Sequence, residues 1–118
     1  MATIAIASAP LIATQTWLVT WGAIANGNDG AVWELNDASD NCFSVDGTFG
    51  SGGSITLKGS NDGTNYYAVH DPLGNALTFT SAGMKQILET PRYIKPYVTA
   101  GDGTTALVPI IRARRGSR

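Results

Sequence analysis

The chain has 118 residues, of which 43% are hydrophobic and only 14% are charged, and its formal net charge is −1. A chain of this length accommodates one domain with a modest core, and its low charge density suits a surface that is partly covered by partners. The single cysteine, Cys42, excludes an intrachain disulfide, and we expect this side chain to be a small hydrophobe rather than a nucleophile.

The charged residues are divided unevenly along the chain. Residues 1–57 carry five acidic side chains and no basic one, whereas residues 58–118 carry eight basic and four acidic side chains. The two halves either cancel each other inside one compact domain or present an acidic edge of one subunit to a basic edge of another. A drift of composition without any role is the third interpretation.

Short runs of β-branched and aromatic residues alternate with turn clusters, a pattern typical of a β-sandwich or barrel. We predict an all-β protein, an antiparallel β-sandwich of jelly-roll or immunoglobulin-like type with about eight short strands, over residues 15–115. Residues 1–14 are predicted to form an N-terminal arm or a first strand, and residues 116–118 a flexible tail. The apolar start has no basic region and is interrupted by Pro10, so we expect neither a signal peptide nor a membrane span.

The predicted strands follow one another at short intervals, over residues 16–21, 31–35, 42–49, 54–59, 66–70, 76–80, 93–99 and 107–113. In the first of them, Trp17, Val19 and Trp21 share one face because side chains alternate along a strand. Residues 84–89 are compatible with either a short strand or one helical turn. Pro96 and Pro109 lie inside the last two strands, which we therefore expect to be edge strands or bulged.

Residue patterns for catalysis or metal binding are not found in the sequence. His70 is the single histidine and no cysteine cluster accompanies it, so the ligands of a zinc site are missing. The glycine-rich residues 50–53 and 101–103 are interpreted as hairpin turns, because neither stretch opens a helix as a phosphate loop does. Asp37 and Asp40 are loop carboxylates, but their spacing does not fit a calcium loop. We predict that the protein is not an enzyme and has no cofactor, metal or small-molecule substrate.

The candidate functional residues are those suited to protein contacts. Trp17, Trp21 and Trp33 are interpreted as core residues, with interface anchors or sugar-stacking platforms as the alternatives. The basic C-terminal stretch is interpreted as a partner for acidic protein loops or as a solvated tail, and it lacks the interleaved aromatic residues expected for binding nucleic acid. The full set of interface candidates is Ile4, Ile6, Leu11, Ile12, Trp17, Trp21, Tyr93, Tyr97, Arg112, Arg114 and Arg115.

Several turn motifs carry a resemblance that covers about the last two-thirds of the chain. They are Gly47-Thr48-Phe49, the turn at residues 59–65, Asp71-Pro72-Leu73-Gly74, Pro91-Arg92-Tyr93-Ile94 and residues 99–104. With these motifs the chain resembles the small head-decoration (cement) proteins of tailed bacteriophages. The resemblance implies a compact β-sandwich on the capsid exterior of a virion, made in the bacterial host cytoplasm. It further implies that the partners are the major capsid protein and other copies of the chain in a homotrimer, without nucleic acid or membrane.

One motif also resembles a different class of protein. A Gly-Ser-Asn-Asp-Gly-Thr-Asn turn followed by aromatic residues occurs in carbohydrate-binding sandwiches of the discoidin type and in phage tail modules. Those proteins usually have tryptophan where this chain has Tyr66 and Tyr67. The alternative function is therefore a tail-associated or carbohydrate-binding module that contacts the host surface.

Overall fold

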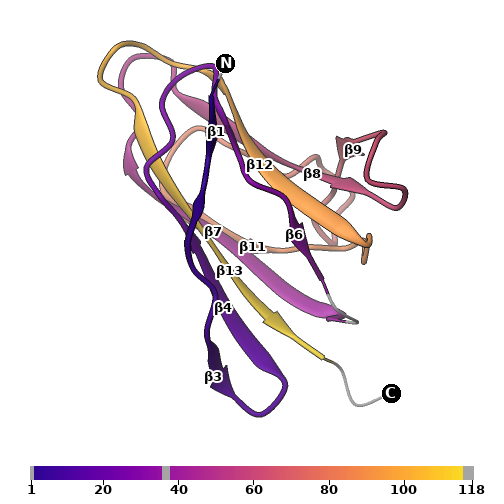
Figure 1. Ribbon diagram of the computed structural model, residues 1–118. Coiled ribbons are helices and arrows are strands. Elements are labelled where there is room, and N and C mark those ends of the chain that lie inside the picture. The colour runs from indigo at the N-terminus through magenta and orange to yellow at the C-terminus, as the bar shows by residue number, and fades with distance from the viewer. Residues whose placement is uncertain (1, 36–37, 116–118) are drawn as a thin grey trace.

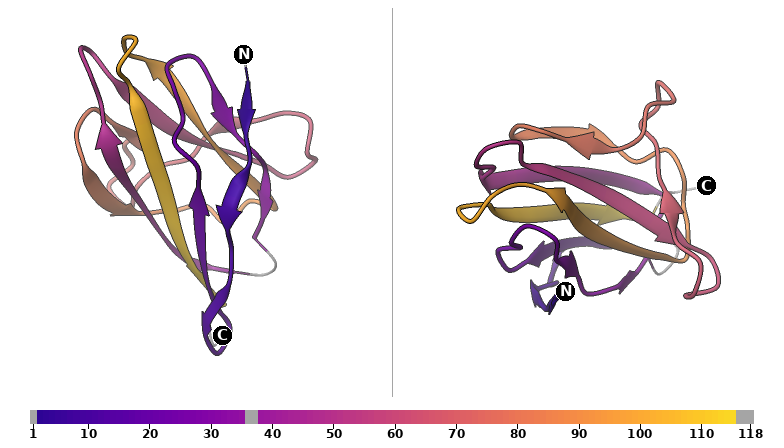
Figure 2. Two further views of the ribbon diagram at one scale, coloured as in Figure 1. Left: turned by 60° about the vertical axis from the view of Figure 1, so that its left-hand side comes forward. Right: turned by 90° about the horizontal axis from the view of Figure 1, so that it is seen from above.

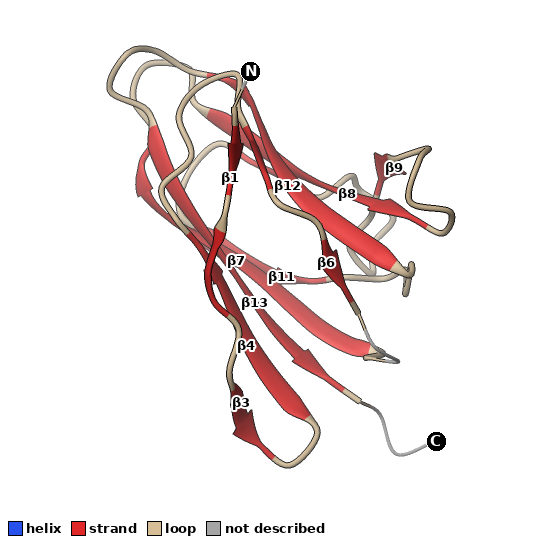
Figure 3. Ribbon diagram, in the orientation of Figure 1, coloured by secondary structure: helices blue, strands red, loops and turns tan. Residues whose placement is uncertain are grey.

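The computed structural model describes residues 2–35 and 38–115. Two β-sheets pack face to face as a sandwich, and the described residues contain strands without any helix (Figures 1 and 3). No helix in this part of the chain is long and apolar enough to cross a membrane. The prediction of an all-β sandwich is confirmed, although the described residues form thirteen strands, seven of which have only two or three residues.

Sheet A contains the strands β1 (Thr3–Ile4), β5 (Asp29–Gly30), β6 (Trp33–Glu34), β8 (Ser54–Ser60), β9 (Tyr67–Ala68), β10 (Thr78–Phe79) and β12 (Tyr93–Ala100). Its order is β1-β5-β12-β8-β10, with β6 also beside β12 and β9 also beside β8. All of these pairings are antiparallel except that of β1 with β5, which is parallel.

Sheet B contains the strands β2 (Ile6–Ser8), β3 (Leu11–Ala13), β4 (Thr16–Trp21), β7 (Asp40–Thr48), β11 (Gly83–Gln86) and β13 (Ala106–Arg114). Its order is β11-β7-β13-β4-β2, with β3 also beside β4. The ambiguous segment 84–89 therefore begins as a strand, because its first residues pair with β7. Figure 2 shows the two layers, with the N-terminal segment along one side of them.

The core lies between the sheets and follows the alternation of side chains along the longer strands. Val19 and Trp21 of β4 are 0% and 1% exposed, and Trp17 packs against the core from the same face, as predicted. The remaining strand residues that fill the core are Phe43, Val45, Ile55, Leu57, Phe79, Ile94, Val98, Leu107, Ile111 and Ala113.

The N-terminal segment folds onto its own chain along one side of the sandwich. Its strand β1 pairs with β5 in sheet A, whereas β2 and β3 pair with β4 in sheet B. Residues 3–13 therefore pass from one sheet to the other and supply an edge to each. The predicted tail at 116–118 lies outside the described residues.

The strand that contains Pro96 lies inside sheet A, so of the two expectations the edge strand is wrong, whereas the bulge is present in β12. Both backbone groups of Val98 face residues 27 and 28, since Gly27 N–H donates to its carbonyl and its N–H donates to Asn28. By alternation, the nitrogen of Pro96 faces the same side, between Tyr97, which pairs with Asp29 of β5, and Ile94, which pairs with Trp33 of β6. The missing N–H therefore lies between these two ladders, and the bulge in β12 lies further on, between Val98 and Ala100.

Pro109 is also inside a sheet, because β13 lies between β7 and β4. Leu107 exchanges both of its backbone hydrogen bonds with Ile24, which places the nitrogen of Pro109 on the side of β4. The ladder between β13 and β4 begins only at Ile110, which pairs with Thr20, so Pro109 lies just outside that ladder. A proline is tolerated in a central strand here because no ladder hydrogen bond with β4 is needed at its position.

Three predicted strands are much shorter than expected. Only two residues of each of the segments 31–35, 66–70 and 76–80 form ladders, as β6, β9 and β10. Val69 and Leu77 belong to the last two segments, and they bond to each other and to Leu57 through single backbone hydrogen bonds. These segments are held by isolated bonds and by burial rather than by continuous pairing.

Candidate interaction surfaces

The outer face of sheet A carries aromatic rings and cations in alternation. Tyr93, Lys95 and Tyr97 of β12 point outward, because the residues between them are buried in the core. Lys95 Nζ lies 4.7 Å from the ring centre of Tyr66, and Lys58 Nζ lies 5.0 Å from that of Tyr97. We call this surface the tyrosine face; it consists of Lys58, Tyr66, Arg92, Tyr93, Lys95 and Tyr97.

Ion pairs balance part of the positive charge on the tyrosine face. Lys95 Nζ lies 3.2 Å from Asp29 Oδ2, and the Asp29 side chain is only 7% exposed. The hydroxyl of Thr3 also donates to this carboxylate at 2.7 Å, so the buried charge is both paired and hydrogen-bonded. Arg92 Nε lies 3.2 Å from Glu34 on the neighbouring strand β6.

The uneven charge distribution along the sequence is thus balanced in part within one chain. Asp29 and Glu34 come from the acidic first half, and they pair with Lys95 and Arg92 of the basic second half. Asp40 does the same with Arg114, at 3.0 Å. Of the interpretations given above, cancellation inside the domain is the one seen at these three pairs.

The outer face of sheet B consists mainly of apolar and small side chains and carries few charges. Its central rows contain half-buried apolar and small side chains from adjacent strands, namely Leu18, Thr20, Cys42, Ser44, Val108 and Ile110. Burial raises the pKa of the Cys42 thiol and the neighbouring Arg112 opposes this shift, so the thiol is protonated at neutral pH. Among the described residues, Arg112 and Asp46 on this face form no ion pair.

The hairpin of β3 and β4 carries the most exposed apolar residues of the N-terminal segment. Leu11 and Ile12 are 62% and 50% exposed, and every residue from 7 to 15 is exposed. Figure 1 shows β3 at the end of the sandwich where the last described residues of the chain also lie. Ile4 and Ile6 behave differently, because they are half-buried and pack against the core.

The interpretation of Trp21 as a core residue is confirmed, and its place among the interface candidates is wrong. Its side chain is 1% exposed and its indole N–H donates to the carbonyl of Ala31 at 2.8 Å, so Trp21 is a core residue. Trp17 and Trp33 are half-buried and meet edge to face, with their ring centres 6.4 Å apart. These two rings link β4 of sheet B to β6 of sheet A.

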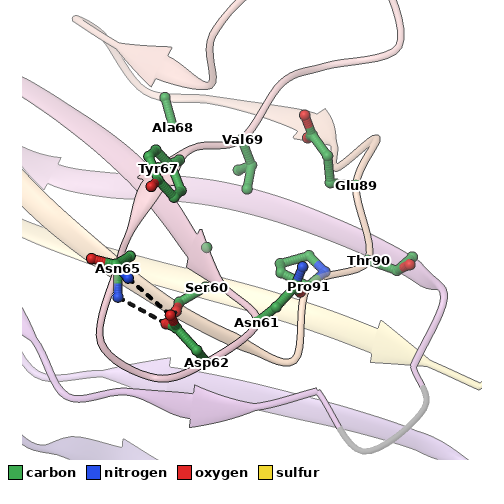
Figure 4. Close-up of a pocket in the computed structure, with 11 residues that line it drawn as sticks. Ser60, Asn61, Asp62, Asn65, Tyr67, Ala68, Val69, Glu89, Thr90 and Pro91 are labelled. Atoms are coloured by element: carbon green, nitrogen blue, oxygen red, sulfur yellow. Dashed lines mark hydrogen bonds between the residues drawn. The ribbon is translucent and has the colours of Figure 1, made fainter.

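A groove of about 420 Å³ lies at one end of sheet A (Figure 4). Its walls are the turn at residues 59–65, the strand β9 with Val69, and residues 89–91. Tyr67 is 71% exposed and stands beside this groove, where Asn61 and Thr90 supply polar atoms. An exposed ring beside polar groups provides a surface on which a sugar ring can stack.

The two carboxylates that line this groove are engaged in structural hydrogen bonds. Asp62 accepts hydrogen bonds from the backbone N–H groups of Asn65 and Thr64 and from the side chains of Asn65 and Ser60, and these bonds hold its pKa far below the usual range. Its role is to close the turn on which the groove is built.

Glu89 is the second carboxylate, and it contacts both the backbone and the side chain of His70. It accepts a hydrogen bond from the backbone N–H of His70 at 2.6 Å, and its other oxygen lies 2.5 Å from His70 Nδ1. Burial raises the pKa of Glu89, but the hydrogen bonds from His70 outweigh it, so the net shift is downward. The sequence pattern did not indicate this pair, because nineteen residues separate its members.

The interface candidates fall on three separate surfaces. Tyr93 and Tyr97 belong to the tyrosine face, Arg112 and Arg114 to the outer face of sheet B, and Leu11 to the exposed hairpin. Arg115 follows β13, and its backbone N–H donates to Gln15 in the turn of that hairpin. Lys58 and Tyr66 were not predicted, because their place beside β12 depends on strand pairing and on the path of a loop.

Residues 2–35 and 38–115 hold no group of three or more His, Cys, Asp or Glu side chains arranged for a metal ion.

The fold is that of a small two-sheet β-sandwich. No protein-family model matches the chain, and a search of curated proteins finds no significant match. Among solved structures, the crystal structure of the SPBc2 prophage-derived protein YomS is similar, with a TM-score of 0.59 and 7% sequence identity. The likeness covers 87% of this chain and 99% of that one, and at this identity it shows the fold alone.

Proposed function

We propose that this chain is a structural virion protein that binds the outside of a phage capsid and bridges neighbouring capsid subunits to stabilise the head. The observation that supports the proposal most is the presence of three chemically distinct contact surfaces on one small sandwich. They are the tyrosine face, the outer face of sheet B and the exposed hairpin with Leu11 and Ile12. A bridging protein needs more than one such surface, whereas an enzyme needs one built site.

Two further observations agree with this proposal. The motif resemblance is to head-decoration proteins, and the fold is similar to that of a prophage-derived protein. Each contact with the capsid then needs only an ordinary size of about 1,600 Å², because a symmetric lattice repeats it and several copies act together. In this role the partner is the major capsid protein, and no reaction is catalysed.

A head-binding assay tests the proposal. Purified chain is added to phage heads that lack it, and bound protein and the temperature of DNA release are measured. We expect saturable binding and a higher release temperature. The double variant Leu11→Asp, Ile12→Asp weakens binding if the hairpin contacts the capsid, whereas Leu73→Asp, at an 86% exposed turn residue, is the matched control. Binding to tails alone, or bound protein without any effect on DNA release, contradicts the proposal.

A second candidate function is a module that binds a carbohydrate of the host surface, and the exposed Tyr67 beside the groove favours it. Binding to a glycan array that Tyr67→Ala abolishes would support this function. The same variant is expected to bind heads normally if the capsid role is correct.

A further inference from the structure

The outer face of sheet B has a centre with a regular arrangement of side chains around it. Ser44 of β7 pairs with Ile110 of β13 in the middle row of the face. Asp46 lies two residues from Ser44 along β7, and Arg112 lies two residues from Ile110 along β13, toward the opposite end of the sheet, since the strands are antiparallel. The acid and the base therefore stand on opposite sides of the Ser44–Ile110 row.

Neither of these two charges is satisfied by an ion pair within the described part of the chain. This distinguishes them from the charges of the tyrosine face, where Lys95 and Arg92 have carboxylate partners. The other charged residues on the outer face of sheet B, Asp40 and Arg114, pair with each other. Asp46 and Arg112 are therefore the two exposed charges on this face that a partner with opposite charges at matching positions would pair with.

We propose that two copies of this chain associate through the outer faces of their B sheets, around a two-fold axis that passes along the Ser44–Ile110 row. Such an axis lies in the interface and runs across the strands, so it reverses the strand direction of the second copy. It places Asp46 of each copy above Cys42 of the other, one strand away from Arg112. The face is thus complementary to itself, as the contact surface of a two-fold dimer must be.

The distances allow Asp46 of one copy to form an ion pair with Arg112 of the other. Neighbouring strands lie about 5 Å apart and packed sheets about 10 Å apart, a gap that an arginine and an aspartate side chain span together. Ile110 then meets its own copy at the centre, and the aliphatic part of Arg112 lies over Val108. The apolar and small residues of the middle rows are thereby removed from water, with an ion pair on either side of them.

The size of the face sets the expected strength of the association. Strands β7 and β13 have nine residues each, which makes the face about 30 Å long, and five strands make it about 20 Å wide. Two copies therefore bury about 1,200 Å² in total, at the low end of specific interfaces. We expect a reversible dimer whose Kd rises with ionic strength, because its two ion pairs lie near the rim. This association does not depend on the proposed capsid role.

Sedimentation velocity of the full chain over a range of concentrations tests the inference. The wild type is expected to shift from monomer to dimer. Asp46→Lys and Arg112→Glu should each raise the dimer Kd by about tenfold or more, since each places like charges together at both pairs. The double variant Asp46→Lys, Arg112→Glu should restore the dimer by reversing both pairs. The matched controls are Lys58→Glu on the tyrosine face and Glu34→Lys beside it, which make the same charge changes and should leave the Kd unchanged.

A variant independent of charge completes the test. Ser44→Arg puts a long side chain at the centre of the face and should abolish the dimer without lowering the melting temperature, because Ser44 points out of the sandwich. The inference is overturned if the wild type stays monomeric or forms a trimer, or if the double charge reversal fails to restore a dimer that the single changes disrupt. A monomer that binds phage heads less tightly after Arg112→Glu would show that the capsid, and not a second copy, covers this face.

Discussion

At the scale of single residues, the position of Trp21 depends on a glycine in the opposite sheet. A Cβ atom added to Gly30 would lie 2.7 Å from Trp21 Cδ1 and 2.6 Å from Pro96 Cγ. The indole therefore occupies space that a side chain at residue 30 would fill. This contact places β4 of sheet B against β5 and β12 of sheet A, so Gly30 is required for the close approach of the two layers.

Gly30→Ala should consequently lower the free energy of unfolding by about 1–3 kcal/mol, the usual cost of overpacking a core. Gly103→Ala is the matched control, because no atom lies within 4 Å of the Cβ it would add. Urea unfolding measures both. Equal midpoints for the two variants would show that the core adjusts freely around residue 30.

The tryptophans should differ in their contribution to stability in a way that follows their burial. Trp21→Ala is expected to cost about 3–5 kcal/mol, because it removes a fully buried ring. Trp33→Ala should cost less, since that ring is half-buried and has Trp17 as its ring partner. If thermal unfolding shows the larger loss for Trp33, the assignment of Trp21 as the central core residue is incorrect.

At the scale of elements, Asp102 joins two hairpin loops at the same end of the sandwich. Its carboxylate accepts hydrogen bonds from Ser51 N–H at 2.8 Å and from both the backbone and the hydroxyl of Thr104. Beside it, the hydroxyl of Thr105 donates to the carbonyl of Phe49 at 2.8 Å. The connection between β12 and β13 is thereby fixed to the connection between β7 and β8.

These bonds make a prediction about acid stability. They lower the pKa of Asp102 from 3.8 to about 2, with the Thr104 hydroxyl as the largest cause and the Ser51 N–H next. Because the folded pKa lies below the unfolded one, the stabilisation is fully present above about pH 4 and is lost as the pH falls toward 2. The difference in melting temperature between wild type and Asp102→Asn should therefore shrink over this interval. A difference that stays constant from pH 5 to pH 2 would contradict the role of the ionised carboxylate.

Local features of the strands and turns could be predicted from the sequence at this scale. The faces of β4, β7 and β8 follow from alternation alone. Three of the motifs that carried the family resemblance are turns closed by an aspartate, at Asp62, Asp71 and Asp102. Such turns depend on only a few consecutive residues, so they can be predicted from a single sequence.

The pairing between distant segments could not be predicted in the same way. Pro96 and Pro109 indicate only that a backbone N–H is missing, and either an edge or an interrupted neighbour satisfies that condition. The contact of His70 with Glu89 and the place of Lys58 beside Tyr97 likewise depend on which strands become neighbours. The interface candidates were identified by residue type, and their distribution over three surfaces follows from the topology of the two sheets.

At the scale of the whole molecule, the low charge of the chain has a structural counterpart. Three ion pairs join the acidic first half of the chain to its basic second half, and the exposed residues 7–15 carry no charge. What remains on the outside is a set of apolar, aromatic and charged surfaces. These surfaces support the central claim of the proposed function, which is that the chain lies between other protein surfaces.

The measurement that tests this claim most directly is the location of the chain on purified virions. If the proposed function is correct, a phage encodes the chain, and electron cryomicroscopy of that phage with and without the gene gives a difference map of the particle. We predict density on the outside of the head at the junctions between capsid subunits, which disappears when the gene is deleted. Density on the tail alone, or virions of identical appearance in the two maps, would contradict the account.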